Sequence, residues 1–158
     1  MDEQPVVDTI MEASAALGID LDRHQAALCA RHLVLLRQWN RHINLTRITD
    51  LHAMVVGHLL DSLLPGRWLP DHGTALDVGS GAGFPGLPLK ILKPGLDMTL
   101  LEATRKKVSF LNVVLARIGL PELRAVQGRW EQLSVTAGTA AIVPFRPGPA
   151  TLARPTGS

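Results

Sequence analysis

The chain has 158 residues, of which 46% are hydrophobic, and its formal net charge is +2. This composition is typical of a globular protein with one core and excludes a disordered chain, and so small a charge does not by itself indicate a polyanionic partner. The single cysteine, Cys29, excludes a disulfide framework and a cysteine metal cluster.

The first 70 residues are predicted to be helical. Apolar residues recur at helical spacing over residues 6–17, 23–42 and 54–64. Asp20 or Asp22 can cap the second helix, and Thr49 or Asp50 the third. We therefore expect an N-terminal helical cap over residues 1–70.

From residue 71 the pattern changes to short apolar runs that alternate with helices. Strands are predicted at 74–78, 97–101 and 123–127, and helices at 85–92 and 104–118. This βαβαβ order is half of a doubly wound α/β sheet, here over residues 71–133. Residues 134–158 contain several prolines and are expected to be an irregular tail, although 140–143 could pair as a short strand.

A glycine-rich turn directly after the first strand is the main functional signal. Gly79, Gly81, Gly83 and Gly86 follow the apolar run that ends at Asp77. Glycine reaches positive φ without steric penalty and lets a ligand contact bare backbone N–H groups. Glu102 lies about 20 residues further on, at the end of the second strand, where a carboxylate can accept bonds from ribose hydroxyls.

The acid ahead of the glycines distinguishes between two cofactors. Asp77 stands two residues before the first glycine, where a dinucleotide pyrophosphate would be repelled. S-adenosylmethionine carries a sulfonium and an ammonium and has no phosphate. Asp77, Gly81, Gly83 and Glu102 therefore favour S-adenosylmethionine over NAD as the ligand.

Three segments resemble the glucose-inhibited division protein B family, the bacterial small-subunit ribosomal RNA methyltransferases G that modify guanine N7 of 16S ribosomal RNA. They are residues 39–46 (WNRHINLT), 58–63 (HLLDSL) and 76–107, which begins LDVGSGAGFPG and ends LLEATRKK. Their order and spacing are similar to the family's over roughly residues 10–133.

The resemblance implies a Rossmann-like methyltransferase fold that binds S-adenosylmethionine at the carboxyl ends of the first three strands. Gly79 and Phe84 would line the methionine and adenosine side, the segment formed by Glu102, Ala103 and Thr104 would hold the ribose, and Trp130 with Glu131 would lie near the adenine. The implied partner is 16S ribosomal RNA or the small ribosomal subunit. Guanine N7 has an in-plane lone pair and no proton, so no general base is expected.

The chain departs from the family after the third strand. Family members continue through four more strands, whereas this chain resembles a truncated member with an unrelated ending. Three interpretations therefore stay open: a 16S ribosomal RNA guanine-N7 methyltransferase, a cofactor-binding protein without catalysis, and a fragment of a dinucleotide-binding oxidoreductase. Asp77 argues against the third.

Secondary site candidates come from the same segments. His58 and Asp61 could bond each other, and Asn44 either faces the cleft or satisfies backbone groups. The basic residues at 105–107 are the best candidates for contacting RNA, whereas Trp39 and Trp68 are expected in the core.

Compartment and metal content follow from what the sequence lacks. The acidic first residues do not resemble a signal peptide, and no apolar run is long enough for a membrane span, so a cytoplasmic protein is expected. The histidines lack metal-ligand spacing, and no metal is predicted.

Overall fold

The computed structural model describes residues 2–133 and 139–142. Its N-terminal part consists of consecutive helical segments, here called the helical cap: α1 (Gln4–Ala16), α2 (Arg23–Asn40), α3 (Leu51–Met54), the π-helical η1 (Val55–Leu60), α4 (Asp61–Leu63) and the 3₁₀ segment η2 (Leu64–Trp68). The last four follow one another without a break, where the sequence predicts one helix over 54–64.

Side chains cap the starts of two of these helices. The Asp22 carboxylate accepts a bond from the Gln25 backbone N–H at 2.7 Å, and the Gln25 side chain accepts one from the Asp22 N–H at 2.9 Å. This reciprocal pair starts α2, and Asp50 starts α3 by accepting from the Ala53 N–H at 2.9 Å. Asp22 and Asp50, rather than Asp20 and Thr49, are therefore the caps.

The rest of the chain forms a parallel sheet in the order β3-β2-β1-β4. The elements are β1 (Gly73–Val78), α5 (Gly86–Leu92), β2 (Leu96–Glu102), α6 (Arg105–Ile118), β3 (Leu123–Gln127), η3 (Trp130–Gln132) and β4 (Ala140–Ile142). The predicted βαβαβ order and its strand positions are confirmed within a residue or two. β4 confirms that the patch at 140–143 can pair, since it lies parallel to β1. The rest of the expected tail, 134–138 and 143–158, lies outside the described residues.

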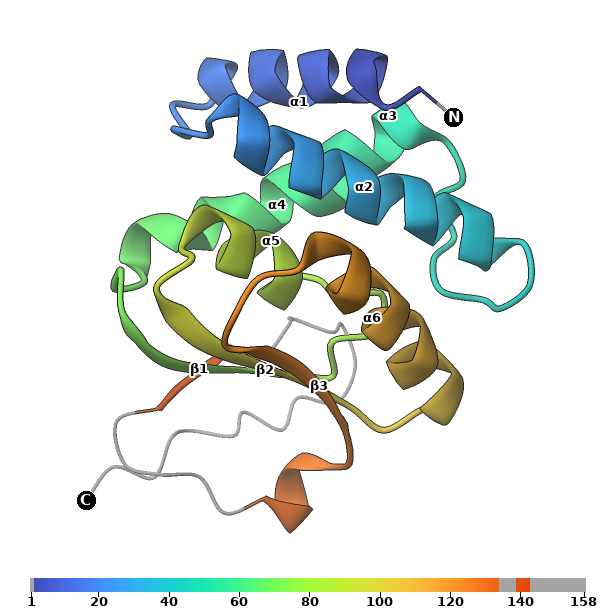
Figure 1. The fold of residues 1–158 in the computed structure, drawn as a ribbon, viewed down its shortest axis with the longest axis vertical. Helices are drawn as coiled ribbons and strands as arrows, with labels where there is room; N and C mark the ends of the chain where they lie inside the picture. Colours follow the sequence, from blue (N-terminus) through green and yellow to red (C-terminus); the bar gives the residue numbers. More distant parts are fainter. Residues whose placement is uncertain (1, 134–138, 143–158) are drawn as a thin grey trace.

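The α-helices lie on one face of the sheet in two layers, with α5 and α6 against the strands and the cap beyond them, whereas η3 lies on the other side of the strands (Figure 1). One continuous hydrophobic core runs through both layers, from Ile10 and Leu36 of the cap to Met98 and Leu100 of β2. Alternation along β2 sends Asp97 and Thr99 to the opposite face, where Arg124 contacts both, at 2.7 and 2.9 Å. The arrangement is the first half of a Rossmann-like α/β fold.

Two tryptophans differ in how they are placed. Trp39 packs against the core, with its ring 5.8 Å from that of Phe110, as predicted. The prediction for Trp68 is wrong, because 76% of this residue is exposed, in the short η2 segment under the Arg67 side chain.

Cys29 is fully buried in α2, and burial raises its pKa to about 12. Its thiol therefore stays protonated at neutral pH and is inert. No helix among the described residues has the length and apolar character that crossing a membrane requires.

Candidate functional site

The glycine turn predicted as a ligand site lies at the carboxyl end of β1 and folds over β2. The N–H groups of Gly79 and Ser80 both donate to the Leu101 carbonyl, at 2.8 and 3.0 Å. Gly79, Gly81 and Gly83 have φ values of 74°, 58° and 101°. These values explain why glycine is required at the three positions, and we call residues 79–86 the glycine loop.

Glu102 connects the glycine loop to the end of β2. Glu102 is only 4% exposed. Its two carboxylate oxygens accept hydrogen bonds from different loops: Oε1 from the Gly81 N–H at 3.1 Å, and Oε2 from the Thr104 N–H at 2.5 Å. Each oxygen keeps a second lone pair. The predicted ribose-binding carboxylate is thus held in place between two strand ends without a ligand.

Asp77 lies beneath the same loop. It is 0% exposed, and its Oδ2 accepts from the Gly86 N–H at 2.9 Å. Burial raises the pKa of this carboxyl to about 7, with the neighbouring Glu102 charge adding to the effect. At neutral pH Asp77 therefore carries only part of a charge, and it acts on the shape of the loop. The negative charge expected from it comes mainly from Glu102.

Two imidazole rings of the helical cap stack with Phe84. The ring centroids of His32 and His58 lie 4.7 and 4.8 Å from that of Phe84. Phe84, which is predicted on the cofactor side, is therefore packed against the cap.

The end of β3 meets the end of β2 through backbone groups. The Gly128 N–H donates to the Glu102 carbonyl at 3.0 Å, and the Gln127 side chain donates to the Ala103 carbonyl at 3.4 Å. Ala103 and Thr104 are exposed at this edge. The predicted ribose segment, 102–104, therefore lies directly between the glycine loop and the end of β3.

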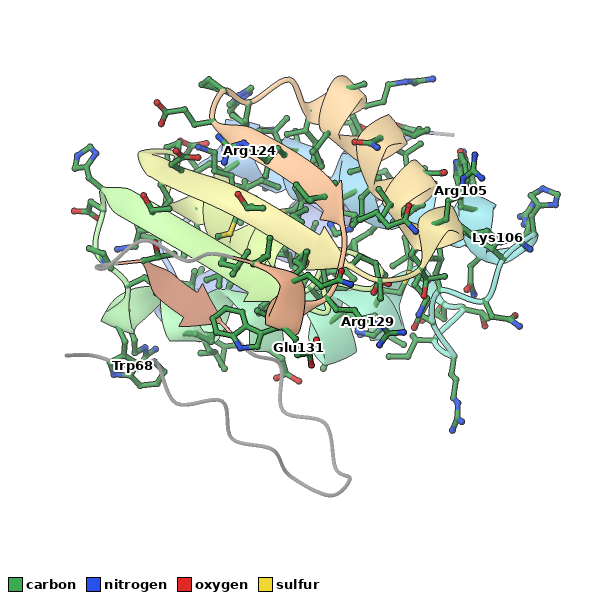
Figure 2. All side chains as sticks on the ribbon, turned by 90° about the horizontal axis from the view of Figure 1, so that it is seen from below. Trp68, Arg105, Lys106, Arg124, Arg129 and Glu131 are labelled. Carbon is green, nitrogen blue, oxygen red and sulfur yellow. The ribbon has the colours of Figure 1, made fainter. Side chains whose placement is uncertain are left out.

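The predicted adenine pair lies further along, in η3. Trp130 is half-buried and Glu131 is exposed, and neither side chain makes a hydrogen bond with the described residues. Figure 2, which views the sheet from the side opposite α5 and α6, shows Glu131 and Arg129 near each other.

The secondary candidates have other partners than expected. His58 bonds Thr46 through Nε2 and Oγ1 at 2.7 Å, not Asp61, and burial lowers its pKa while Asp61 raises it in part. Asn44 is exposed. The backbone groups at this helix end are bound by Asn40 instead, whose Oδ1 accepts hydrogen bonds from the Leu45 and Thr46 N–H groups, each at 2.9 Å.

Asn40 and His32 are two residues of the site region that the sequence does not predict. Asn40 belongs to the WNRHINLT segment and stands at the end of a predicted helix, which is a usual position for an amide that binds backbone groups. No signal in the sequence marks His32.

Basic side chains gather at the carboxyl edge of the sheet. Arg105 and Lys106 are exposed at the start of α6, and Figure 2 shows them at the same end as Arg129. Arg124 and Trp68 lie toward the other end of the strands. Of the described residues, none pairs as an anion with Arg105, Lys106 or Arg129.

Metal-ligating residues do not cluster in the described part of the chain: no group of three or more His, Cys, Asp or Glu side chains there could hold an ion.

The family profile for rRNA small subunit methyltransferase G (GidB) matches residues 25–146. The chain belongs to this family. A relative from Syntrophobacter fumaroxidans, named ribosomal RNA small subunit methyltransferase G 1, is 51% identical over 132 residues, covering 84% of this chain and 60% of its own. Relatives with the name ribosomal RNA small subunit methyltransferase G are 42% identical in Roseiflexus castenholzii (79% of this chain, 54% of that one) and 46% identical in Chloroflexus aggregans (77% and 52%).

The chain spans only about half to three fifths of the length of these relatives. Family membership confirms the resemblance and removes the oxidoreductase interpretation.

A solved Plasmodium falciparum structure with S-adenosyl-L-homocysteine, described as a protein-L-isoaspartate O-methyltransferase, aligns with a TM-score of 0.44 at 16% identity, over 82% of this chain and 65% of that one. This likeness is too distant to bear on the function.

Proposed function

We propose that the carboxyl edge of the sheet binds S-adenosylmethionine, and that the chain belongs to an enzyme that methylates guanine N7 of 16S ribosomal RNA in the cytoplasm. The observation that carries the proposal is Glu102, a buried carboxylate fixed between the Gly81 and Thr104 N–H groups. It stands where three strand ends meet, the usual ligand position in an open α/β sheet.

The residues at this edge fit the parts of the cofactor. Glu102 has free lone pairs for two ribose hydroxyls, and the positive-φ backbone of Gly79, Gly81 and Gly83 leaves room for close approach. Ala103 and Thr104 are exposed residues that would lie beside the ribose, and Trp130 with Glu131 would extend the edge toward the adenine.

Methyl transfer to guanine N7 needs little help from acids or bases. When bound, S-adenosylmethionine supplies an electrophilic methyl group on a sulfonium. The work left to the chain is to fix the cofactor through the glycine loop and Glu102, and to keep water away with the packed loop. We assign no catalytic residue.

RNA would approach the same edge. Arg105 and Lys106 are exposed there with Lys107 next in the chain, and Arg129 lies nearby (Figure 2). Phosphate contacts by such side chains supply most of the sequence-independent affinity for nucleic acids.

A second candidate is cofactor binding without methyl transfer. It is favoured by the site itself, in which Glu102 and the glycine loop fit a cofactor while no described residue is assigned to the transfer step. The cofactor contacts described above lie within the matched part.

Two assays test these proposals. Calorimetric titration with S-adenosylmethionine and with NAD should show tighter binding of S-adenosylmethionine, and tighter binding of NAD would contradict the cofactor assignment. Transfer of a tritiated methyl group to unmethylated small subunits, with a full-length relative as positive control, separates the candidates. A rate within a few-fold of the control supports the enzyme, and cofactor binding with no transfer supports the second candidate.

A further inference from the structure

Three buried or half-buried rings connect the helical cap to the glycine loop. His32 of α2, Phe84 of the loop and His58 of η1 form a stack with ring centroids 4.7 and 4.8 Å apart, at angles of 27° and 13°. The loop residue Phe84 therefore stacks with two residues of the cap.

His32 also bonds the loop backbone. Its Nε2 lies 2.7 Å from the Ala82 carbonyl oxygen, and the residue is 0% exposed. A carbonyl only accepts, so Nε2 carries the proton and the neutral ring has none on Nδ1. Nδ1 is buried and has no partner among the described residues. Burial lowers the pKa of His32 to about 4, which keeps this neutral form at neutral pH.

The fit between His32 and the loop is close. A Cβ built on Gly83 would lie 3.1 Å from His32 Nε2 and 3.3 Å from its Cε1. Gly83 also has a φ of 101°. The absence of a side chain at Gly83 is therefore what lets the imidazole reach the carbonyl of the preceding residue.

Two consecutive residues of the loop are fixed from opposite sides. Glu102 of the sheet accepts from the Gly81 N–H, while His32 of the cap donates to the Ala82 carbonyl. We propose that His32 is a positioning residue for the cofactor site: through its hydrogen bond to the Ala82 carbonyl, the helical cap sets the conformation of the glycine loop. This inference rests on the proposed cofactor site, although its effect on the loop can be measured without a ligand.

Two variants separate the hydrogen bond from the packing. His32→Gln keeps a donor near the Nε2 position, whereas His32→Phe keeps a ring against Phe84 and leaves the Ala82 carbonyl unpaired. Ile10→Ala is the control, because Ile10 is equally buried in the cap but lies in α1, away from the loop. It lowers stability without touching the site.

The first measurement is amide hydrogen exchange of residues 79–86 in the ligand-free full chain. The quantity compared is the ratio of the exchange rate of residues 79–86 to the exchange rate of the β2 core. His32→Phe should raise this ratio at least about tenfold, as expected for loss of a buried hydrogen bond. His32→Gln and Ile10→Ala should leave the ratio unchanged. Equal ratios in His32→Phe and the wild type would overturn the proposal.

The second measurement is the dissociation constant of S-adenosyl-L-homocysteine. We expect it to rise roughly tenfold in His32→Phe and to stay within about threefold of the wild type in His32→Gln and Ile10→Ala. A His32→Phe variant that binds as tightly as the wild type contradicts the positioning role. If the wild type itself binds no ligand, the proposed function fails, and the exchange ratio still decides whether His32 holds the loop.

Discussion

The two ends of the proposed site are built differently. At the ends of β1 and β2, backbone groups of the glycine loop are bound by the buried side chains of His32, Asp77 and Glu102. At the end of β3, the exposed Glu131 and the half-buried Trp130 make no side-chain hydrogen bond with the described residues. The first end is preorganised, so substitutions there should lower both the stability of the fold and the affinity for the cofactor. Substitutions at the second end should lower only the affinity for the cofactor.

The largest expected effect concerns the buried carboxyl of Asp77. Its pKa is about 7 in the folded chain, against 3.8 for an ordinary aspartate, so the folded state binds this proton more tightly. Asp77 therefore makes its full contribution to the free energy of unfolding below about pH 4. This contribution, at most about 4 kcal/mol, is lost as the pH rises through 7.

Asp77→Asn removes this titration and keeps an oxygen for the Gly86 N–H. Urea unfolding of both proteins from pH 4 to 8 should show the variant gaining stability relative to the wild type as the pH rises. A constant difference between the two would show that the Asp77 carboxyl has the same pKa in the folded and the unfolded chain, which would contradict the raised pKa.

Gly86→Ala should destabilise the preorganised end by about 3 kcal/mol, the upper end for overpacking. The added Cβ would lie 2.5 Å from Leu100 Cδ2 and 2.6 Å from Asp77 Oδ2, both fixed in the core. Gly119→Ala is the control, because Gly119 caps α6 at a φ of 68° and a Cβ added there would have no non-neighbouring heavy atom within 4 Å. This substitution should lower stability by about 1 kcal/mol. Equal urea midpoints for the two variants would refute the tight packing around Gly86.

Glu102→Ala and Glu131→Ala compare the two ends directly. Glu102→Ala leaves the Gly81 and Thr104 N–H groups without their partner, so stability should fall by about 2 kcal/mol and cofactor binding should weaken at least about tenfold. Glu131→Ala should change stability by less than about 0.5 kcal/mol. Unfolding and calorimetry on both variants check this, and a stability loss in Glu131→Ala would remove the contrast between the ends.

A smaller effect is expected for RNA affinity. Replacing both Arg105 and Lys106 by alanine should weaken binding of a 16S ribosomal RNA fragment. The slope of the logarithm of the RNA association constant against the logarithm of the salt concentration should become shallower by about 0.7 for each lost phosphate contact. The control replaces Arg67 and Arg117, which are also exposed but belong to segments near the amino ends of the strands. Equal losses in both double variants would show that the carboxyl edge is not the RNA surface.

Most of the fold could be predicted because it depends on local pattern. The strands at 74–78 and 123–127 and the cap by Asp22 follow from apolar periodicity and helix-start chemistry. The glycine loop and Glu102 could be placed at one edge because the carboxyl ends of parallel strands always meet.

The misses are contacts between distant segments. His32 and Ala82 are 50 positions apart, and nothing local indicates that an imidazole of one helix bonds that carbonyl. The exposure of Trp68 and the burial of Asp77 likewise depend on which segments pack above them. The state of charge of Asp77 could not be predicted from the motif that contains it.

Ligand-linked unfolding tests most directly whether the glycine loop binds S-adenosylmethionine. At about 100 times the dissociation constant, S-adenosyl-L-homocysteine should raise the free energy of unfolding of the wild type by about 2.7 kcal/mol, and NAD at the same concentration should not. Gly81→Val should lose this gain while Gly119→Val keeps it, although both residues have similar positive φ values, 58° and 68°, and open surroundings. A gain from NAD that equals or exceeds that from S-adenosyl-L-homocysteine, or an undiminished gain in Gly81→Val, would contradict the cofactor site proposed here.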